Sequence, residues 1–171
     1  QHLVRMAYAR HLLSANRWND SEPQLQQLTI RQPTMAEAWL MLGALQLQNG
    51  QQDAAHASLT QFLTQATHMD ADRQKKGLAQ AYLLLAQVEE QRKNNSQARA
   101  WLDRIDPEEN TLGIQLRRAM LMGREGKLSE AQTLIQNAPG DQPADLRAKT
   151  LAQVQLLKDA KQPSAAFDLL G

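Results

Sequence analysis

Apolar residues recur along this chain at the spacing of one helix face, and short polar turns interrupt them at regular intervals. Four stretches share one order: a turn, a small residue, and then apolar residues at helical spacing. They are NGQQDAAHASL, KNNSQARAWL, EGKLSEAQTLI and AKQPSAAFDLL. Because residues at i, i+3 and i+4 lie on one face of an α-helix, each stretch predicts a turn that leads into an amphipathic helix.

These stretches align on one small residue, and an earlier match extends the alignment to five repeats. The aligned positions are 34, 43, 33 and 35 residues apart and are Ser21, Ala55, Ala98, Ala131 and Ala166. Four positions later the residue is always apolar: Leu25, Leu59, Leu102, Ile135 or Leu170. Twelve positions earlier, in a preceding helix, stands Ala9, Gly43, Ala86, Ala119 or Val154. Each repeat is therefore expected to contain two helices of about 13 residues joined by a short turn.

The turn inside each repeat falls at Asn16, Gly50, Lys93, Gly126 or Lys161. Glycine and asparagine are favoured in the left-handed conformation that ends many helices, and the two lysines depart from that rule. Asp53, Ser96 and Ser129 follow three of these turns. Their side-chain oxygens can accept the free N–H groups of a first helical turn, so we predict that they cap the second helices.

A period of 33–35 residues with two helices per repeat resembles the tetratricopeptide repeat (TPR) family. The second repeat has the family's aromatic, Leu, Gly, turn Gly, Ala and large apolar residue at Trp39, Leu42, Gly43, Gly50, Ala55 and Leu59. Phe62 stands where the family usually has alanine. The resemblance implies an all-α fold, namely an α-solenoid in which antiparallel helix pairs form a right-handed superhelix.

The resemblance covers almost the whole chain and implies a single TPR-like array over residues 1–171. Its repeats are 2–35, 36–69, 70–109, 112–141 and 144–171, the last with a truncated second helix. The 43-residue step places extra residues between Thr67 and Ala79. They predict a lengthened first helix in the third repeat, capped by Asp70 or Asp72. A surface loop followed by a helix of ordinary length is the alternative.

Gly43 lies in the middle of a strong helix pattern, where glycine costs about 1 kcal/mol relative to alanine. Pairing of the two helices explains it, because the partner helix that enters at Ala55 is expected to come closest at this point. The larger apolar residues then fill the space around the small ones. On this interpretation the aromatic residues Trp39, Tyr82 and Trp101 are packing residues.

Composition and charge narrow the classes of function. The net charge is +1, with 19 basic and 18 acidic residues, so neither nucleic acid nor an anionic membrane is an expected partner. The chain has no cysteine, which excludes disulfides and thiolate metal sites. No apolar run approaches the roughly 18 residues of a membrane span. Cytoplasm and periplasm are both compatible with this composition.

The sequence offers no arrangement of residues suited to catalysis or to a cofactor. The segment HMDAD contains His68, Asp70 and Asp72, but capping of a helix explains its acids better than a metal site does. The segment GREGKLSE lacks the spacing of a phosphate loop and is interpreted as a helix–helix turn. We therefore expect no enzymatic activity, no cofactor and no metal.

In proteins of this family the first helices of successive repeats line a concave wall. By register, the candidate partner-binding residues are Arg10, Leu47, Gln48, Leu83, Gln87, Gln91, Met120, Arg124, Gln155 and Lys158. The resemblance implies a non-catalytic protein–protein interaction scaffold that binds a peptide segment or a helix of a partner protein in this groove. Amide side chains suit a peptide backbone, and Leu or Met suits its apolar side chains.

The alternative function is a structural spacer or a self-association module of a larger protein, forming homo-oligomers through the exposed ends of the array. The chain starts at Gln1 and stops after the apolar run FDLL. We therefore expect it to be a fragment of a longer bacterial protein.

Overall fold

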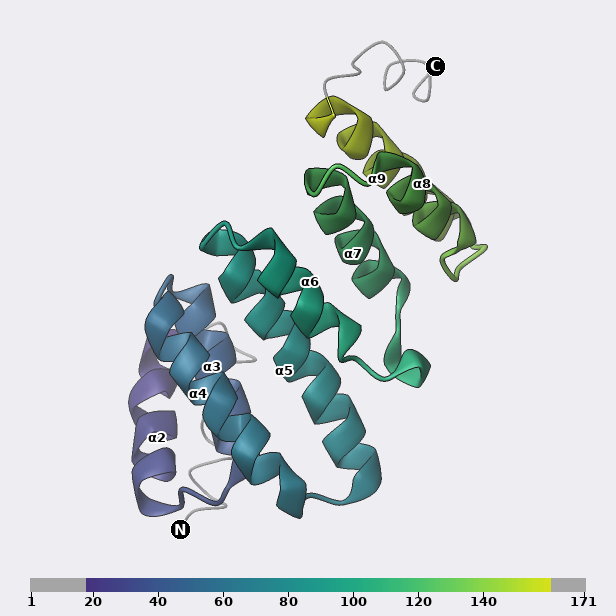
Figure 1. Ribbon diagram of the computed structural model, residues 1–171. Helices are drawn as coiled ribbons and strands as arrows, with labels where there is room; N and C mark the ends of the chain where they lie inside the picture. Colours follow the sequence, from purple (N-terminus) through teal and green to yellow (C-terminus); the bar gives the residue numbers. More distant parts are fainter. Residues whose placement is uncertain (1–17, 161–171) are drawn as a thin grey trace. The chain divides into compact units, whose positions relative to one another are not determined.

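The computed structural model describes residues 18–160, and these residues form helices and turns without a strand (Figure 1). The α-helices are α2 Trp18–Arg31, α3 Ala36–Gln48, α4 Gln52–Gln65, α5 Ala71–Gln91, α6 Asn95–Asp103, α7 Leu112–Arg124, α8 Leu128–Asn137 and α9 Pro143–Asp159. Two short 3₁₀ helices, η1 Ala66–His68 and η2 Pro107–Glu109, lie in the connections. Successive helices form antiparallel pairs, so the predicted all-α solenoid is confirmed.

The chain divides into two compact units, unit 1 Gln1–Arg92 and unit 2 Lys93–Gly171. In unit 1, α3 packs against α2, α4 and α5, and α4 also packs against α5. In unit 2, α7 packs against α6, α8 and α9, and α8 also packs against α9. The single array over residues 1–171 stays a prediction, and its truncated last helix lies outside the described residues.

The aligned small residues are the core of the helix pairs. Within the described residues they are all fully buried, as Ser21, Ala55, Ala98 and Ala131. The apolar residues four positions later are buried as well: Leu25, Leu59, Leu102 and Ile135. The repeat register is therefore confirmed for these positions. The predicted partners Ala9, Ala166 and Leu170 lie outside the described residues.

At Gly43, α4 lies very close to α3, as expected of a small residue in the helix pair. A Cβ atom built on Gly43 would lie 2.7 Å from Cγ of Leu59 and 3.5 Å from the carbonyl oxygen of Ala55. The first distance is too short for any carbon–carbon contact without movement of Leu59. Glycine therefore lowers helix propensity at this position and allows the two helices to approach.

The extra residues of the third repeat form helix, because α5 extends over 21 residues. The Asp70 side chain caps it, accepting a hydrogen bond from the Arg73 backbone N–H at 3.1 Å. Gly77 in this helix faces the ring of Phe62 on α4: a Cβ atom on Gly77 would lie 2.8 Å from Cζ of Phe62. The phenyl ring at a position where the family usually has alanine is thus matched by a missing side chain on the neighbouring helix.

The predicted helix caps at Asp53, Ser96 and Ser129 are wrong. Each lies at the second residue of its helix, and the capping positions are Gln51, Asn94 and Lys127, which make no side-chain cap hydrogen bond. The reason is the tightness of the turns. Each capping residue directly follows the left-handed residue, so the helix begins earlier than the predicted caps require.

The turn residues of three successive repeats share a left-handed backbone. The φ angles are 76° at Gly50, 62° at Lys93 and 86° at Gly126. Lys93 therefore has the conformation that glycine has in its neighbours, although a Cβ atom makes that conformation unfavourable.

We expect Lys93→Gly to raise the free energy of unfolding by about 0.5 kcal/mol, because relief of the left-handed strain exceeds the entropy that glycine adds to the unfolded chain. Urea unfolding followed by circular dichroism measures this change. Gly50→Ala is the matched control and is expected to lower the free energy of unfolding. No atom lies within 4 Å of the Cβ position of Gly50, so only the φ angle opposes the substitution. A Lys93→Gly variant that is less stable than the native chain would contradict the presence of left-handed strain at Lys93.

Candidate partner-binding site

The first helices of the second and third repeats, α3 and α5, lie side by side in unit 1 and run parallel. Near their starts, Nη2 of Arg73 lies 3.5 Å from Oε2 of Glu37. Of the candidate residues on these helices, Gln48 and Gln91 are exposed, and Leu83 and Gln87 are half-buried. Four candidates in unit 1 thus keep accessible surface.

Leu47 is a correction, because its side chain is 7% exposed and belongs to the core. The physical reason is the position of α3. Packing against α2, α4 and α5 leaves this helix little open surface, and eight of its 13 residues are buried. Register alone placed Leu47 on an open face, whereas the neighbouring helices close that face.

Unit 2 carries its own candidates on α7 and α9. Met120 is half-buried and packs against the cluster of Ala119, Ala131, Ile135 and Leu156. Arg124, Gln155 and Lys158 are exposed. The Gln155 side-chain amide donates a hydrogen bond to Oδ1 of Asp159 at 2.8 Å. Arg10, the remaining candidate, lies outside the described residues.

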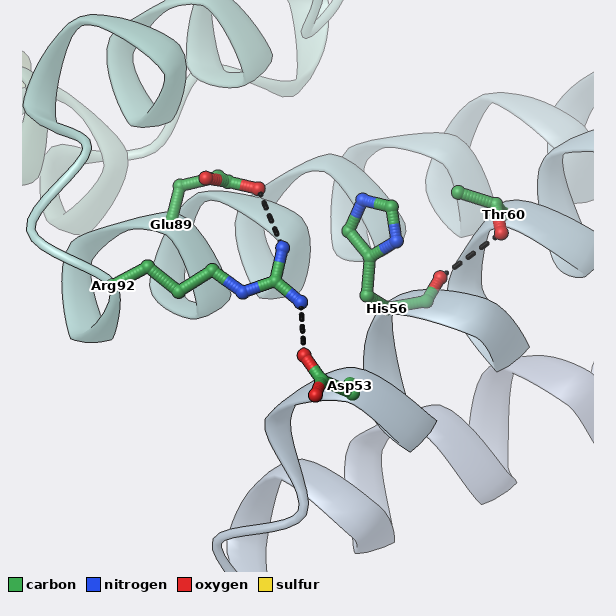
Figure 2. Close-up of polar contacts among 5 residues, drawn as sticks. All are labelled: Asp53, His56, Thr60, Glu89 and Arg92. Carbon is green, nitrogen blue, oxygen red and sulfur yellow. Dashed lines mark hydrogen bonds and ion pairs between the residues drawn. The ribbon is translucent and has the colours of Figure 1, made fainter.

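An ion cluster joins the end of α5 to the start of α4 in unit 1 (Figure 2). One guanidinium nitrogen of Arg92 lies 2.6 Å from Oδ1 of Asp53, and the other lies 3.3 Å from Oε1 of Glu89. His56 and Thr60 belong to the same stretch of α4, where the Thr60 hydroxyl donates to the His56 carbonyl oxygen at 3.0 Å. Because Glu89 is buried, its pairing with Arg92 matters for the fold. The cluster holds in place the helix end that carries Gln91.

Two polar side chains link α3 and α4 inside the core. The Ser58 hydroxyl donates a hydrogen bond to Oε1 of Gln46 at 2.6 Å, and both residues are buried. Gln46 precedes two candidate residues in the sequence, yet it points into the helix pair. The spacing of small and apolar residues does not predict this link or the Arg92 cluster, because both depend on polar side chains that meet only in the packed structure.

The predicted packing role suits the aromatic residues. Trp39 packs against the cluster of Leu25, Leu28, Ala38, Leu42 and Leu45. Its indole N–H donates to the Pro33 carbonyl oxygen at 2.8 Å. Trp101 is half-buried, and the guanidinium carbon of Arg104 lies 4.7 Å from the centre of its ring system. Tyr82 is half-buried on α5.

The segments weighed for other chemistry have structural roles. Asp70 caps α5, and Gly126 forms the left-handed turn between α7 and α8. Over residues 18–160, no group of three or more His, Asp and Glu side chains is placed to hold a metal ion. In the same range, no helix has both the length and the apolar character required to cross a membrane.

Comparison with known proteins identifies the repeat. Residues 7–70 match the family model described as tetratricopeptide repeat. No curated protein matches the chain. The fold, in contrast, matches 45 chains among solved structures.

Three of these structures illustrate the likeness. MamA protein is 14% identical, with a TM-score of 0.75 over 99% of this chain and 87% of that one. YrrB, described as a TPR protein with an unusual peptide-binding site, is 13% identical, with a TM-score of 0.70 over 99% and 83%. The TPR-like repeats of a putative kinesin light chain from Podosopora anserina are 17% identical, with a TM-score of 0.73 over 98% and 90%. At these identities the likeness concerns the fold.

Proposed function

Because residues 7–70 match the tetratricopeptide repeat model and the fold is that of TPR proteins, we propose that this chain binds a peptide segment or a helix of a partner protein in a groove lined by the first helices of its repeats. The general role of a protein–protein interaction scaffold follows from the fold. Members of this family are typically non-catalytic. The groove and its occupant are the proposal.

The observation that carries the proposal is the row of amide side chains on α3 and α5. Gln48 and Gln91 are exposed near the ends of their parallel helices, and Gln87 lies one turn before Gln91. An amide group offers both donors and an acceptor, so it can pair with the N–H and C=O groups of an extended peptide. Leu83, half-buried on the same helix, adds apolar surface for a side chain of that peptide.

Unit 2 supports the same function with a different balance of residues. Met120 offers a deformable apolar surface, and Arg124 and Lys158 offer positive charge at the ends of α7 and α9. The described peptide-binding site of YrrB shows that one protein of this fold has such a function. A peptide with apolar residues and a few acids is the occupant that these side chains favour.

A triple substitution on the first helices tests the groove. We expect Gln48→Ala, Gln87→Ala and Gln155→Ala together to reduce partner recovery at least about tenfold, because several peptide hydrogen bonds are lost at once. The matched control replaces Gln61, Gln97 and Gln136, which are exposed on the second helices α4, α6 and α8. Affinity capture from lysate, quantified by mass spectrometry, measures both. Equal recovery by the two triple variants would contradict the groove.

The alternative of a spacer or self-association module rests on the ends of the array. Those ends lie largely outside the described residues. Light scattering over a range of protein concentrations separates the two functions, since self-association raises the mean mass with concentration. A strict monomer at high concentration would count against self-association.

A further inference from the structure

Helix α9 carries an apolar face that no described residue covers. Leu146 and Leu151 are 52% and 62% exposed, and with Arg147 and Thr150 they line a hollow of about 330 Å³. Among the described residues, Ile30 is the only other large apolar side chain in this state. Two neighbouring exposed leucines on one helix mark a candidate contact surface.

The repeat register shows what lies on the corresponding face elsewhere in the chain. With Val154 aligned on Gly43, Leu146 and Arg147 correspond to Met35 and Ala36 at the start of α3, and Leu151 corresponds to Leu40. In unit 1, Ala36 and Leu40 are only 6% and 8% exposed.

The next repeat contributes to this contact in unit 1. Met35 and Ala36 line a hollow together with Met69, Asp70 and Arg73, which belong to the beginning of α5 and the turn before it. Arg73 also pairs with Glu37 on α3. In unit 1, therefore, the start of α5 lies beside this face of α3.

We propose that an amphipathic helix of a partner protein docks on the α9 face, in the position that the start of α5 takes on α3. Apolar residues one turn apart on that helix contact Leu146 and Leu151. Its first turn supplies an acid, because the α9 face carries Arg147, which forms no ion pair with the described residues. In unit 1 the charges are reversed: the acid is Glu37 on α3, one position beyond the register of Arg147, and the arginine is on α5.

A second copy of this chain is a poorer occupant. The hollow at this face is small, about 330 Å³, and suits a single helix. The other exposed apolar residue, Ile30, is followed by Arg31, which would bring like charges together at Arg147. The size and charge of the face both favour a short acidic helix that binds weakly.

This surface differs from the proposed groove, although the two adjoin at Arg147 and Leu151. Leu151 has the register of Leu83, a groove candidate, and Arg147 lies one turn before Leu151 on the same side of α9, whereas Leu146 lies off that side. Leu146→Asp therefore tests the docking face alone, and the glutamine triple variant tests the groove. If one proposal fails, the other can still be tested.

The experiment uses the full chain and two synthetic helices. Both copy residues 69–84 of this chain, which include the helix start that lies beside α3, and one carries Arg73→Glu. We expect the glutamate peptide to bind about tenfold more tightly than the arginine peptide, as measured by fluorescence anisotropy. Arg147→Glu should reverse that order, and Leu146→Asp should weaken both peptides about tenfold. Ile30→Asp and the glutamine triple variant should bind as the native chain does.

Three results would overturn the proposal. One is the absence of binding up to about 1 mM of either peptide. Another is that the two peptides bind the native chain equally and also bind the Arg147→Glu variant equally. The third is a rise in mass with protein concentration that Leu146→Asp abolishes, since that would assign the face to a second copy. Circular dichroism spectra confirm that each variant is folded; every substituted position is exposed except Gln87, which is half-buried.

Discussion

Gly43→Leu is expected to lower the free energy of unfolding by about 3 kcal/mol, although leucine favours helix by nearly 1 kcal/mol over glycine. The added side chain has no room, since even its Cβ atom would lie 2.7 Å from Cγ of Leu59. Leu59 is fully buried and cannot move aside without displacing other core residues. The substitution therefore separates α3 from α4. Urea unfolding followed by circular dichroism measures the loss.

A glycine without such a neighbour provides the control for Gly43. Gly113 lies in the first turn of α7, and the nearest atom to its Cβ position is Oγ1 of Thr111 at 3.9 Å. Gly113→Ala should raise stability by about 0.5 kcal/mol through helix propensity. Gly43→Ala should lower it because of the contact with Leu59. If both alanine variants stabilise the chain equally, the close approach at Gly43 does not limit packing.

Phe62→Ala is expected to lower the free energy of unfolding by about 4 kcal/mol, because it removes a fully buried aromatic side chain. Among the described residues, Phe62 is the largest fully buried side chain, and its ring fills the space left by the missing side chain of Gly77. Removal of the ring leaves a cavity between α4 and α5 that the stiff helices cannot close. The midpoint of urea unfolding should fall accordingly. Gln61→Ala, at the exposed neighbouring position, should change stability by less than about 0.5 kcal/mol.

A double-mutant cycle tests whether Phe62 and Gly77 are matched. Gly77→Ala alone should destabilise the chain, because its Cβ atom would lie 2.8 Å from the Phe62 ring. Combined with Phe62→Leu, the same substitution should cost much less, since the smaller side chain frees the space. Strictly additive effects would show that the two residues do not share one packing site.

Much of the fold could be predicted because TPR-like repeats place equivalent residues at equivalent points of contact. Ser21, Ala55, Ala98 and Ala131 were aligned from spacing alone, and all four are fully buried. The length of α5 was predicted in the same way, from the extra residues that follow Thr67. The positions of close contact can be recognised in the sequence, because close approach of two backbones excludes large side chains there.

The candidate site was less predictable. Gln48 and Gln91 are exposed as the register suggested, whereas Leu47 is a core residue because three helices surround α3. The caps at Asp53, Ser96 and Ser129 were placed too late, because side-chain preference does not reveal how tightly a turn closes. Lys93 has a left-handed backbone, which residues with a Cβ atom rarely adopt, so residue preference did not predict it.

The residue pattern was thus sufficient to establish the helix pairs, their repeat and the positions of their smallest contacts, since these depend on spacing along one chain. The packed structure was needed for three further features: the Ser58–Gln46 bond, the Arg92 cluster and the open face at Leu146 and Leu151. Each depends on which side chains from distant parts of the sequence meet, or fail to meet. A leucine in a helix pattern is compatible with both the core and the surface, and the neighbouring helices decide between them.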